Sequence, residues 1–336
     1  MARAERVDAV LAHRLLNVHE ADLWPAGARA TLAYHLRQHL VLESLRHREL
    51  VRLIAAFASA HIDILLLKGA GLAYTVYPAP HLRPRDDTDL FIRRDDLGRA
   101  GQALADCGYA RVEEPDAELA STQRHYTMDD GARLRHIVDL HWRIAIPRVF
   151  ADALAFDEMW PRAIAVPALG AAVRTCGLAD ALLLACVHRV AHHHDAPDLL
   201  WLWDIHLLAE RVRPAELGVF AAAAARARMC AVCRRGLDLA HEHFGTRIDD
   251  IAPALERARG SAEEPASEFV GGLRPIDVLR SDLRALRGWR ARSRLVCEHL
   301  FPPTDHMRAQ HGAHTSLPLA YLRRIVRGAP SWFKLP

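Results

Sequence analysis

The sequence predicts an α+β protein in which a small central α/β core lies between a helical N-terminal region and a helical C-terminal region. Apolar residues recur at helical spacing through residues 1–60. Short β-compatible runs separated by turn signals occupy the middle of the chain. Beyond about residue 175 almost every segment has a helical pattern. We therefore expect three domains, at residues 1–60, 61–170 and 171–336.

The composition is that of an ordinary globular protein. The 336 residues are 51% hydrophobic and 25% charged, with a formal net charge of +3. So small a charge makes no strong case for nucleic acid as a partner. No apolar stretch is long enough to cross a bilayer without a charge, so no membrane span is expected. Six cysteines without a disulfide-like spacing, and a start that lacks a secretory pattern, favour a reducing cytoplasmic location.

The central core is predicted to begin with two strands joined by a glycine turn and a proline-rich loop. Residues 62–67 form a short apolar run typical of a strand, and the turn Lys68-Gly69-Ala70-Gly71 then opens a short helix. A loop rich in proline and charge leads to a second expected strand over residues 88–93. A helix over residues 95–108 follows it.

A third strand is predicted over residues 136–144, because side chains of different character alternate there. Asp139 and His141 fall on one face of this strand, while Val138 and Leu140 fall on the other. The apolar face is expected to pack against helices. The polar face is then free to carry chemistry.

Three aspartates of the core predict a metal site. Asp87 and Asp89 are two residues apart in a strand and project together, whereas Asp86 points away. Carboxylates on one face repel each other, and a bound cation is the usual compensation. Asp139 lies between apolar neighbours and would be costly to bury without a partner. Asp87, Asp89 and Asp139 are therefore our candidate metal ligands and catalytic residues for phosphoryl or nucleotidyl transfer.

The ordered motifs resemble the uncharacterised nucleotidyltransferase-like proteins of the superfamily that contains kanamycin nucleotidyltransferase, poly(A) polymerase and DNA polymerase β. The resemblance covers roughly residues 60–210. The matching residues of the core are Lys68, Gly69, Ala70, Tyr77, Pro78, Leu82, Arg83, Pro84, Asp87, Asp89, Leu90, Asp139, Leu140, His141 and Trp142.

This resemblance implies a fold, a cofactor and a reaction. The fold would be a small mixed sheet with flanking helices and a helical domain that closes over the nucleotide. The cofactor would be Mg²⁺, with Mn²⁺ as an alternative, and the substrate a nucleoside triphosphate such as ATP. The reaction would move a nucleotidyl group to an acceptor, which the sequence leaves open as a small molecule, a peptide or a protein.

Further residues are expected to bind the nucleotide. Lys68 and Gly69 stand where the wider superfamily has a Gly-Ser pair, and lysine can bind phosphate as a point charge. Arg83 is expected to support the phosphate or the acid cluster. Asp139 is the candidate general base, with His141 assisting it, orienting it, or forming a hydrogen bond that stabilises the strand.

The helical region supplies three more candidates. His188 and His192 are four residues apart on one helix, and Asp204 lies on the next helix. We expect all three to face a groove that opens onto the acids and to contact the nucleotide. The His188/His192 spacing can also bind zinc, but Arg189 stands where a zincin would have glutamate.

Alternative interpretations remain open. Asp87 and Asp89 could lie in a solvated turn, with Asp139 on a sheet edge. The same residues could also serve a kinase-like phosphotransferase or a non-catalytic nucleotide-binding module. A kinase would release a nucleoside diphosphate, whereas a nucleotidyltransferase would release pyrophosphate.

Overall fold

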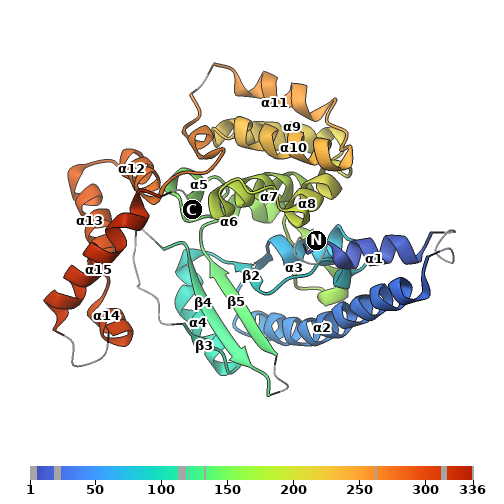
Figure 1. Ribbon diagram of the computed structural model, residues 1–336, viewed down its shortest axis with the longest axis horizontal. Helices are drawn as coiled ribbons and strands as arrows, with labels where there is room; N and C mark the ends of the chain where they lie inside the picture. Colours follow the sequence, from blue (N-terminus) through green and yellow to red (C-terminus); the bar gives the residue numbers. More distant parts are fainter. Residues whose placement is uncertain are drawn as a thin grey trace.

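The computed structural model describes residues 6–18, 24–112, 119, 121–131, 134–261, 263–311 and 316–334. Within this part of the chain, one mixed sheet is flanked by helices, which confirms the predicted α+β class (Figure 1). Its strands are β1 (Leu65–Leu66), β2 (Thr88–Phe91), β3 (Ala110–Arg111), β4 (Gln123–Asp129), β5 (Arg135–His141), β6 (Ile164–Ala165) and β7 (Arg174–Thr175). They lie in the order β3-β4-β5-β2-β1-β7-β6.

The helices fall into three groups along the chain. The N-terminal and core helices are α1 (Asp8–Leu16), α2 (Ala26–Ser59), α3 (Lys68–Thr75), α4 (Leu97–Asp106), α5 (Arg148–Ala151) and α6 (Phe156–Met159). The middle helices are α7 (Leu178–His193), α8 (Leu199–Ala209), α9 (Pro214–Arg226), α10 (Cys230–Phe244) and α11 (Ile251–Arg259). The last are α12 (Pro275–Ala285), α13 (Trp289–Leu300), α14 (Thr304–His311) and α15 (Leu317–Trp332). None of the described helices is long and apolar enough to cross a membrane.

One face of the sheet packs against the long helix α2. Leu50, Leu53, Ile54 and Phe57 recur at intervals of three and four residues, so they form one buried stripe along that helix. This stripe belongs to the same apolar cluster as Leu66, Leu90, Val138 and Leu140, the strand residues that point toward it. The predicted apolar face of the third strand is therefore confirmed.

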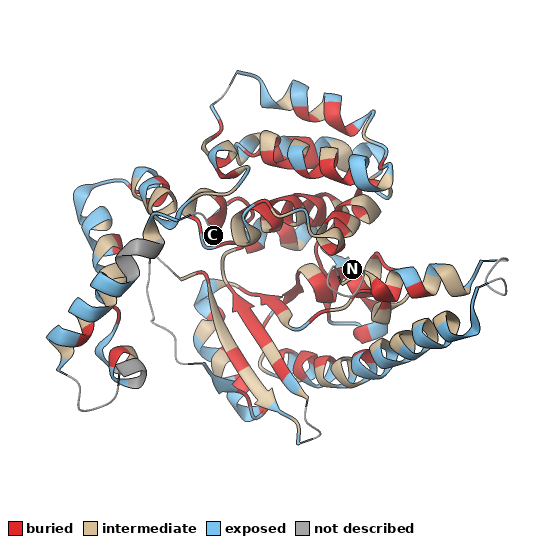
Figure 2. Ribbon diagram, viewed as in Figure 1, coloured by how far each residue is buried: buried red, intermediate tan, exposed pale blue. Residues whose placement is uncertain are grey.

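The opposite face of the sheet lies under the middle helices. Leu65 and Phe91 belong to a second apolar cluster that includes Leu182 and Val187 of α7. Figure 2 shows buried residues running from the strands into these helices. Because Asp89 precedes the α2-facing Leu90, its side chain projects to the α7 side. The two central strands thus present their polar residues to the helical region.

The register of β2 and β5 brings two acids together. These strands are parallel neighbours, and Asp89 pairs with Asp139. On its other edge β5 pairs with β4 in antiparallel fashion, which places His125 opposite Asp139. A row of three polar residues therefore crosses three adjacent strands on one face of the sheet.

The strands differ from the sequence-based expectation in length and number. The strand expected over residues 62–67 is only Leu65–Leu66, and the strand expected over residues 136–144 ends at His141. Strands β3, β4, β6 and β7 were not predicted. The reason is clearest in β4, where only Tyr126 is buried, so the hydrophobic alternation of a half-buried strand is missing. The segment between α11 and α12 contains a 3₁₀ turn at Pro265–Phe269.

Gly71 provides a test of how tightly α3 packs on the sheet. A Cβ atom at Gly71 would lie 3.0 Å from the Leu66 carbonyl oxygen and clash with Thr175 Oγ1. We expect Gly71→Ala to destabilise the fold by about 1–3 kcal/mol through overpacking. The matched change Gly98→Ala lies in α4 with no atom within 4 Å and should stabilise by about 0.5–1 kcal/mol. Urea unfolding of both variants measures the difference, and equal effects would contradict this packing.

Candidate active site

The loop that delivers the acids to β2 is fixed from two sides. Arg83 makes a two-pronged ion pair with Asp204 of α8, with nitrogen–oxygen distances of 2.8 and 2.7 Å. Two residues later, Arg85 Nη2 donates to Glu43 Oε1 of α2 at 2.8 Å. All four of these side chains are buried, whereas Asp86 is largely exposed. Arg83 therefore anchors the loop to α8 and Arg85 anchors it to α2. These two contacts set the position of Asp87 and Asp89, which follow.

Asp89 lies at the centre of the buried site. Its Oδ1 accepts hydrogen bonds from Lys68 Nζ and from His141 Nε2, both at 2.7 Å. Burial by itself would raise the pKa of the Asp89 carboxyl, but the Lys68 ammonium and the His141 hydrogen bond outweigh it and hold that pKa well below its usual range. Burial and the nearby Lys68 charge lower the pKa of His141, so its imidazole is neutral. Asp89 is therefore an ionised carboxylate with a neutral histidine and a cation beside it.

Lys68 reaches Asp89 from an uncommon backbone conformation. It stands at the junction of β1 and α3 with a φ of 43°, in the left-handed region that side chains rarely adopt. Such strain persists only where the surroundings enforce it, and it is frequent at functional sites. The conformation turns the chain so sharply that an eight-residue helix begins immediately after the strand.

Asp139 is held by the neighbouring strand rather than by Lys68. His125 Nδ1 lies 2.6 Å from Asp139 Oδ1, and Gln123 Nε2 donates to Asp139 Oδ2 at 3.2 Å. Gln123 Nε2 also lies 3.0 Å from His125 Nε2. The simplest tautomer therefore has His125 accepting from Gln123 and donating to Asp139. This arrangement orients the Asp139 carboxylate toward the acid cluster.

The Asp87 carboxylate is repelled by the charges of Asp89 and Asp139. Burial, followed by the charges of Asp89 and Asp139, raises the pKa of the Asp87 carboxyl to about 6. A carboxylate disfavoured by like charges is the electrostatic signature of a site that a cation would relieve. Among the described residues, however, the ligand atoms that lie within 4.8 Å of one another belong to Asp89, Asp139 and His141. The structure thus adds His141 to the candidate donors, with Asp87 nearby.

This donor set fits a divalent cation. Two carboxylates supply the hard oxygen ligands that Mg²⁺ prefers, and an imidazole nitrogen suits Mn²⁺ and other transition metals. His141 is fully buried, and its Nδ1 has no hydrogen-bond partner among the described atoms. A buried nitrogen without a partner is costly, so the chemistry of this donor set fits a bound cation.

The histidines of α7 lie close to this cluster. Burial, then the Lys68 charge, lowers the pKa of His192 to about 3 and holds that of His188 well below its usual value. His188 stacks on His192 with ring centroids 5.3 Å apart and contacts Trp201 edge-on. Both imidazoles are therefore neutral. Neutral rings offer hydrogen bonds and aromatic surface rather than charge.

The groove expected between the sheet and helices α7 and α8 is nearly closed. Lys68, His188, Trp201 and Asp204 line a common cavity of about 30 Å³. That volume accommodates a water molecule and not a nucleotide. His188 and Asp204 do converge near Lys68, but a nucleotide would need the helical layer to move away from the sheet.

Three predicted residues have partners that the sequence did not suggest. Arg83 and Asp204, both expected to contact the nucleotide or the acids, bind each other in a buried pair that also receives the Tyr77 hydroxyl at 2.7 Å. His141 contacts Asp89 and not Asp139, so the expectation that it orients Asp139 is corrected to His125. Gly69 lies between Lys68 and the loop, where a Cβ would come within 3.3 Å of Arg85.

Comparison with known proteins is consistent with this arrangement. The pattern of the family described as uncharacterised nucleotidyltransferase matches residues 1–245. The chain belongs to this nucleotidyltransferase family. The matched region contains every residue of the acid cluster and the α7–α8 layer, and it ends at the last residue before the loop that leads to α11.

Two solved structures from Helicobacter pylori are similar to this nucleotidyltransferase family member. JHP933 is 13% identical, with a TM-score of 0.34, covering 68% of this chain and 92% of its own. A second chain, described as a candidate nucleotidyltransferase, is 12% identical, with a TM-score of 0.33, covering 68% and 95%. No functionally curated protein matches the chain significantly.

The residues that sequence reasoning missed are Gln123 and His125. Both project from β4 to the side of Asp139, because residues two apart share a strand face. The available signal was the spacing of Gln123 and His125 two residues apart in a segment with one buried residue, Tyr126. It was weak because a strand with polar side chains on its exposed face cannot be distinguished from a loop without its neighbour.

The pKa of Asp87 predicts a pH dependence of stability. An unfolded aspartate has a pKa of about 3.9, and the folded value is about 6. Below about pH 4 the Asp87 carboxyl is protonated in both states and does not affect stability. As the pH rises from about 4 to about 6, ionisation of Asp87 favours the unfolded state, so the free energy of unfolding falls through this window. Asp87→Asn should raise the urea midpoint at pH 7.5 but not at pH 4 in metal-free protein. The exposed neighbour change Asp86→Asn should do neither, and equal behaviour of the two variants would contradict the assignment.

Proposed function

We propose that this protein is a divalent-metal-dependent nucleotidyltransferase that moves a nucleotidyl group from a nucleoside triphosphate to an acceptor. The observation that carries the proposal is the register of β2 and β5, which sets Asp89 beside Asp139 in the core of a nucleotidyltransferase family member. Lys68 on Asp89 adds a cation at the place where the wider superfamily binds phosphate. We place the family, on the same residues, in the superfamily of DNA polymerase β and kanamycin nucleotidyltransferase.

Each side chain receives a role in this proposal. Asp89 and Asp139, with Asp87 beside them, would hold Mg²⁺ or Mn²⁺. The bound cation would neutralise phosphate oxygens and polarise the transferred group. Lys68, which balances Asp89 in this structure, would then be released to contact a phosphate. Asp139, oriented by His125, would take the proton of the acceptor.

Lys68 is the side chain beside the carboxylates that can attract an anionic substrate once a metal is bound. His188 and His192 are neutral, and the Arg83 guanidinium is already neutralised by Asp204. Lys68 is therefore the cation best placed to respond when the carboxylates bind a metal. Lys68 is also the first residue of α3, so backbone amides at the start of this helix can bind a phosphate beside it.

Product analysis tests the proposed reaction. The protein should be incubated with Mg²⁺, a cell extract and each of the four labelled triphosphates, followed by mass analysis of products. Release of pyrophosphate and a product heavier by one nucleoside monophosphate would support nucleotidyl transfer. Release of a nucleoside diphosphate would instead identify the kinase-like alternative. Triphosphate binding without turnover would leave the protein as a binding module.

Lys68 gives a separate prediction about substrate binding. Lys68→Ala should weaken binding of a non-hydrolysable triphosphate by about tenfold or more, because a charge-assisted hydrogen bond is lost. Isothermal titration in the presence of Mg²⁺ measures the change. Lys334, an exposed lysine near the C-terminus, provides the control as Lys334→Ala. Unchanged affinity in Lys68→Ala would remove Lys68 from the binding site.

A further inference from the structure

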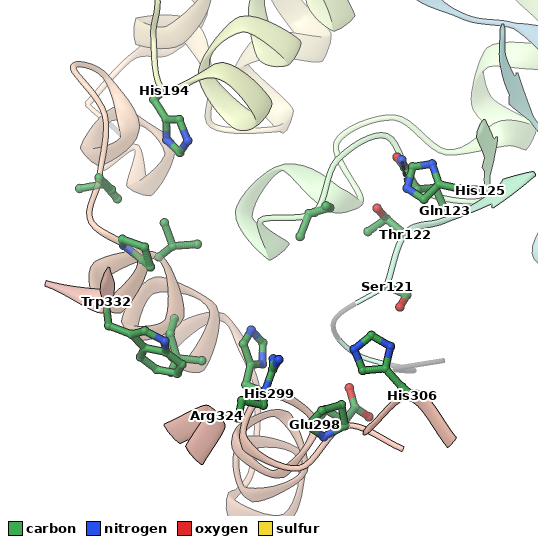
Figure 3. A pocket seen from close by; sticks show the side chains of 16 residues that line it. Ser121, Thr122, Gln123, His125, His194, Glu298, His299, His306, Arg324 and Trp332 are labelled. Atoms are coloured by element: carbon green, nitrogen blue, oxygen red, sulfur yellow. Dashed lines mark hydrogen bonds between the residues drawn. The ribbon is translucent and has the colours of Figure 1, made fainter. Parts of the chain in front are cut away.

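A cavity of about 730 Å³ lies on the far side of Asp139, between the start of β4 and the C-terminal helices. Figure 3 shows Thr122, Gln123 and His125 on one wall, with His299, Arg324 and Trp332 on the wall that faces it. A volume of this size is typical of sites for small molecules. It is far larger than the closed space beside Lys68, so it is the better candidate for a substrate site.

The cavity is joined to the acid cluster through two side chains. Gln123 and His125 line it, and both hydrogen-bond the Asp139 carboxylate on their other side. Asp139 is thus one side chain away from the cavity. A ligand that displaced Gln123 would come into direct reach of Asp139.

The wall next to Asp139 contains polar atoms without partners. Thr122 Oγ1 and Gln123 Oε1 are buried and make no hydrogen bond among the described residues. Thr122 is only 2% exposed. Buried polar atoms are nearly always paired, and each unpaired one costs about 1–3 kcal/mol. A hydroxyl group of a ligand would satisfy both atoms, because it can donate to one and accept from the other.

The remaining walls combine apolar side chains with histidines, Glu298 and Arg324. Leu273, Val278, Leu279 and Trp332 supply hydrophobic surface. The acidic residue in the lining, Glu298, is already engaged by Arg294 Nε and by the Leu119 amide, each at 3.0 Å. Arg324 is half-buried and makes no ion pair with a described side chain, so a ligand anion would be favoured there.

The C-terminal helices hold this wall in place. Asp282 of α12 is buried and accepts a hydrogen bond from the Arg148 amide at the start of α5, at 2.7 Å. Helix α12 also contacts α15. These helices lie beyond residue 245, where the family match ends, whereas the acid cluster lies inside it. The chemistry and the cavity wall therefore come from different parts of the chain.

We propose that this cavity is the acceptor subsite of the nucleotidyl transfer proposed above, on which this inference rests. The acceptor is an amphipathic small molecule with a hydroxyl at Thr122 and Gln123, an apolar body, and an anionic group at Arg324. Its hydroxyl oxygen forms a bond to the α-phosphorus as the bond to pyrophosphate breaks, and the hydroxyl proton passes to Asp139. The helices α12–α15 select the acceptor, while the family core activates the nucleotide.

A fluorescent apolar anion, anilinonaphthalene sulfonate, probes the cavity in the full-length protein without metal or triphosphate. Leu279→Trp fills the cavity and should abolish saturable binding, whereas Arg280→Trp, exposed on the same helix, should retain it. Arg324→Gln should weaken binding about tenfold, and its exposed neighbour change Arg323→Gln should leave it unchanged. Equal affinity in Leu279→Trp and wild type, or in Arg324→Gln and Arg323→Gln, would overturn the proposed site.

A second measurement ties the cavity to the reaction. The same probe should inhibit transfer to the acceptor in cell extract without changing triphosphate affinity. Inhibition that acts on triphosphate binding would assign the cavity to another role and overturn the acceptor subsite. If no triphosphate is turned over but the cavity variants behave as expected, the proposed reaction fails while the amphipathic-anion site stands. The two failures are therefore distinguishable.

Discussion

Asp139→Asn is expected to lower nucleotidyl transfer by about a thousandfold or more, because it removes both a metal ligand and the proposed general base. The amide keeps the size of the carboxyl and can still meet Gln123, so the sheet should remain folded. Triphosphate affinity should change much less than turnover, since Lys68 contacts Asp89 and not Asp139. Turnover and binding are measured separately on the same preparation.

The control for this variant is Asp129→Asn. Asp129 is an exposed carboxylate on β4 that pairs with Arg135 at 3.0 Å. It should retain full turnover. Near-normal turnover in Asp139→Asn with the true acceptor would exclude Asp139 as base and would remove it from the metal site. If instead His141→Ala alone abolished turnover in a folded protein, histidine would become the preferred base.

Arg83→Met is expected to destabilise the protein by about 3–5 kcal/mol, since it leaves the Asp204 carboxylate buried and unpaired. Asp204 is 4% exposed, and among the described side chains the Tyr77 hydroxyl would remain as its hydrogen-bond donor. The double variant Arg83→Met/Asp204→Leu should recover most of the loss, because an apolar pair of similar volume replaces the ions. Urea unfolding of the single and double variants gives the coupling energy.

An exposed ion pair provides the matched control for this cycle. Arg226 and Glu158 are 2.9 Å apart, with side chains 53% and 44% exposed. Arg226→Met should cost about 1 kcal/mol or less. If Arg83→Met were as stable as wild type and yet lost triphosphate affinity, Arg83 would be a nucleotide contact, as its sequence position suggested. A loss of stability with retained triphosphate affinity would show that the Arg83–Asp204 pair holds the loop before β2 against α8.

The sequence by itself determined the local arrangement of the acids. A strand has a period of two, so the apolar neighbours of Asp89 and Asp139 predicted that both side chains leave the α2 face. Asp87 precedes β2, and its projection together with Asp89 stays a prediction. The helical pattern of α2 likewise fixed its buried stripe. These features depend on residues within one element, and the alternation of polar and apolar types encodes them directly.

Only the tertiary structure decided which residues meet. Asp89 and Asp139 are brought together by a parallel register, Asp204 reaches Arg83 from 121 residues away, and His125 finds Asp139 across an antiparallel pair. The large cavity appears only when the C-terminal helices pack beside β4. Such contacts depend on the summed burial and hydrogen bonding of the whole chain, because no local pattern specifies the partner of an isolated arginine or histidine.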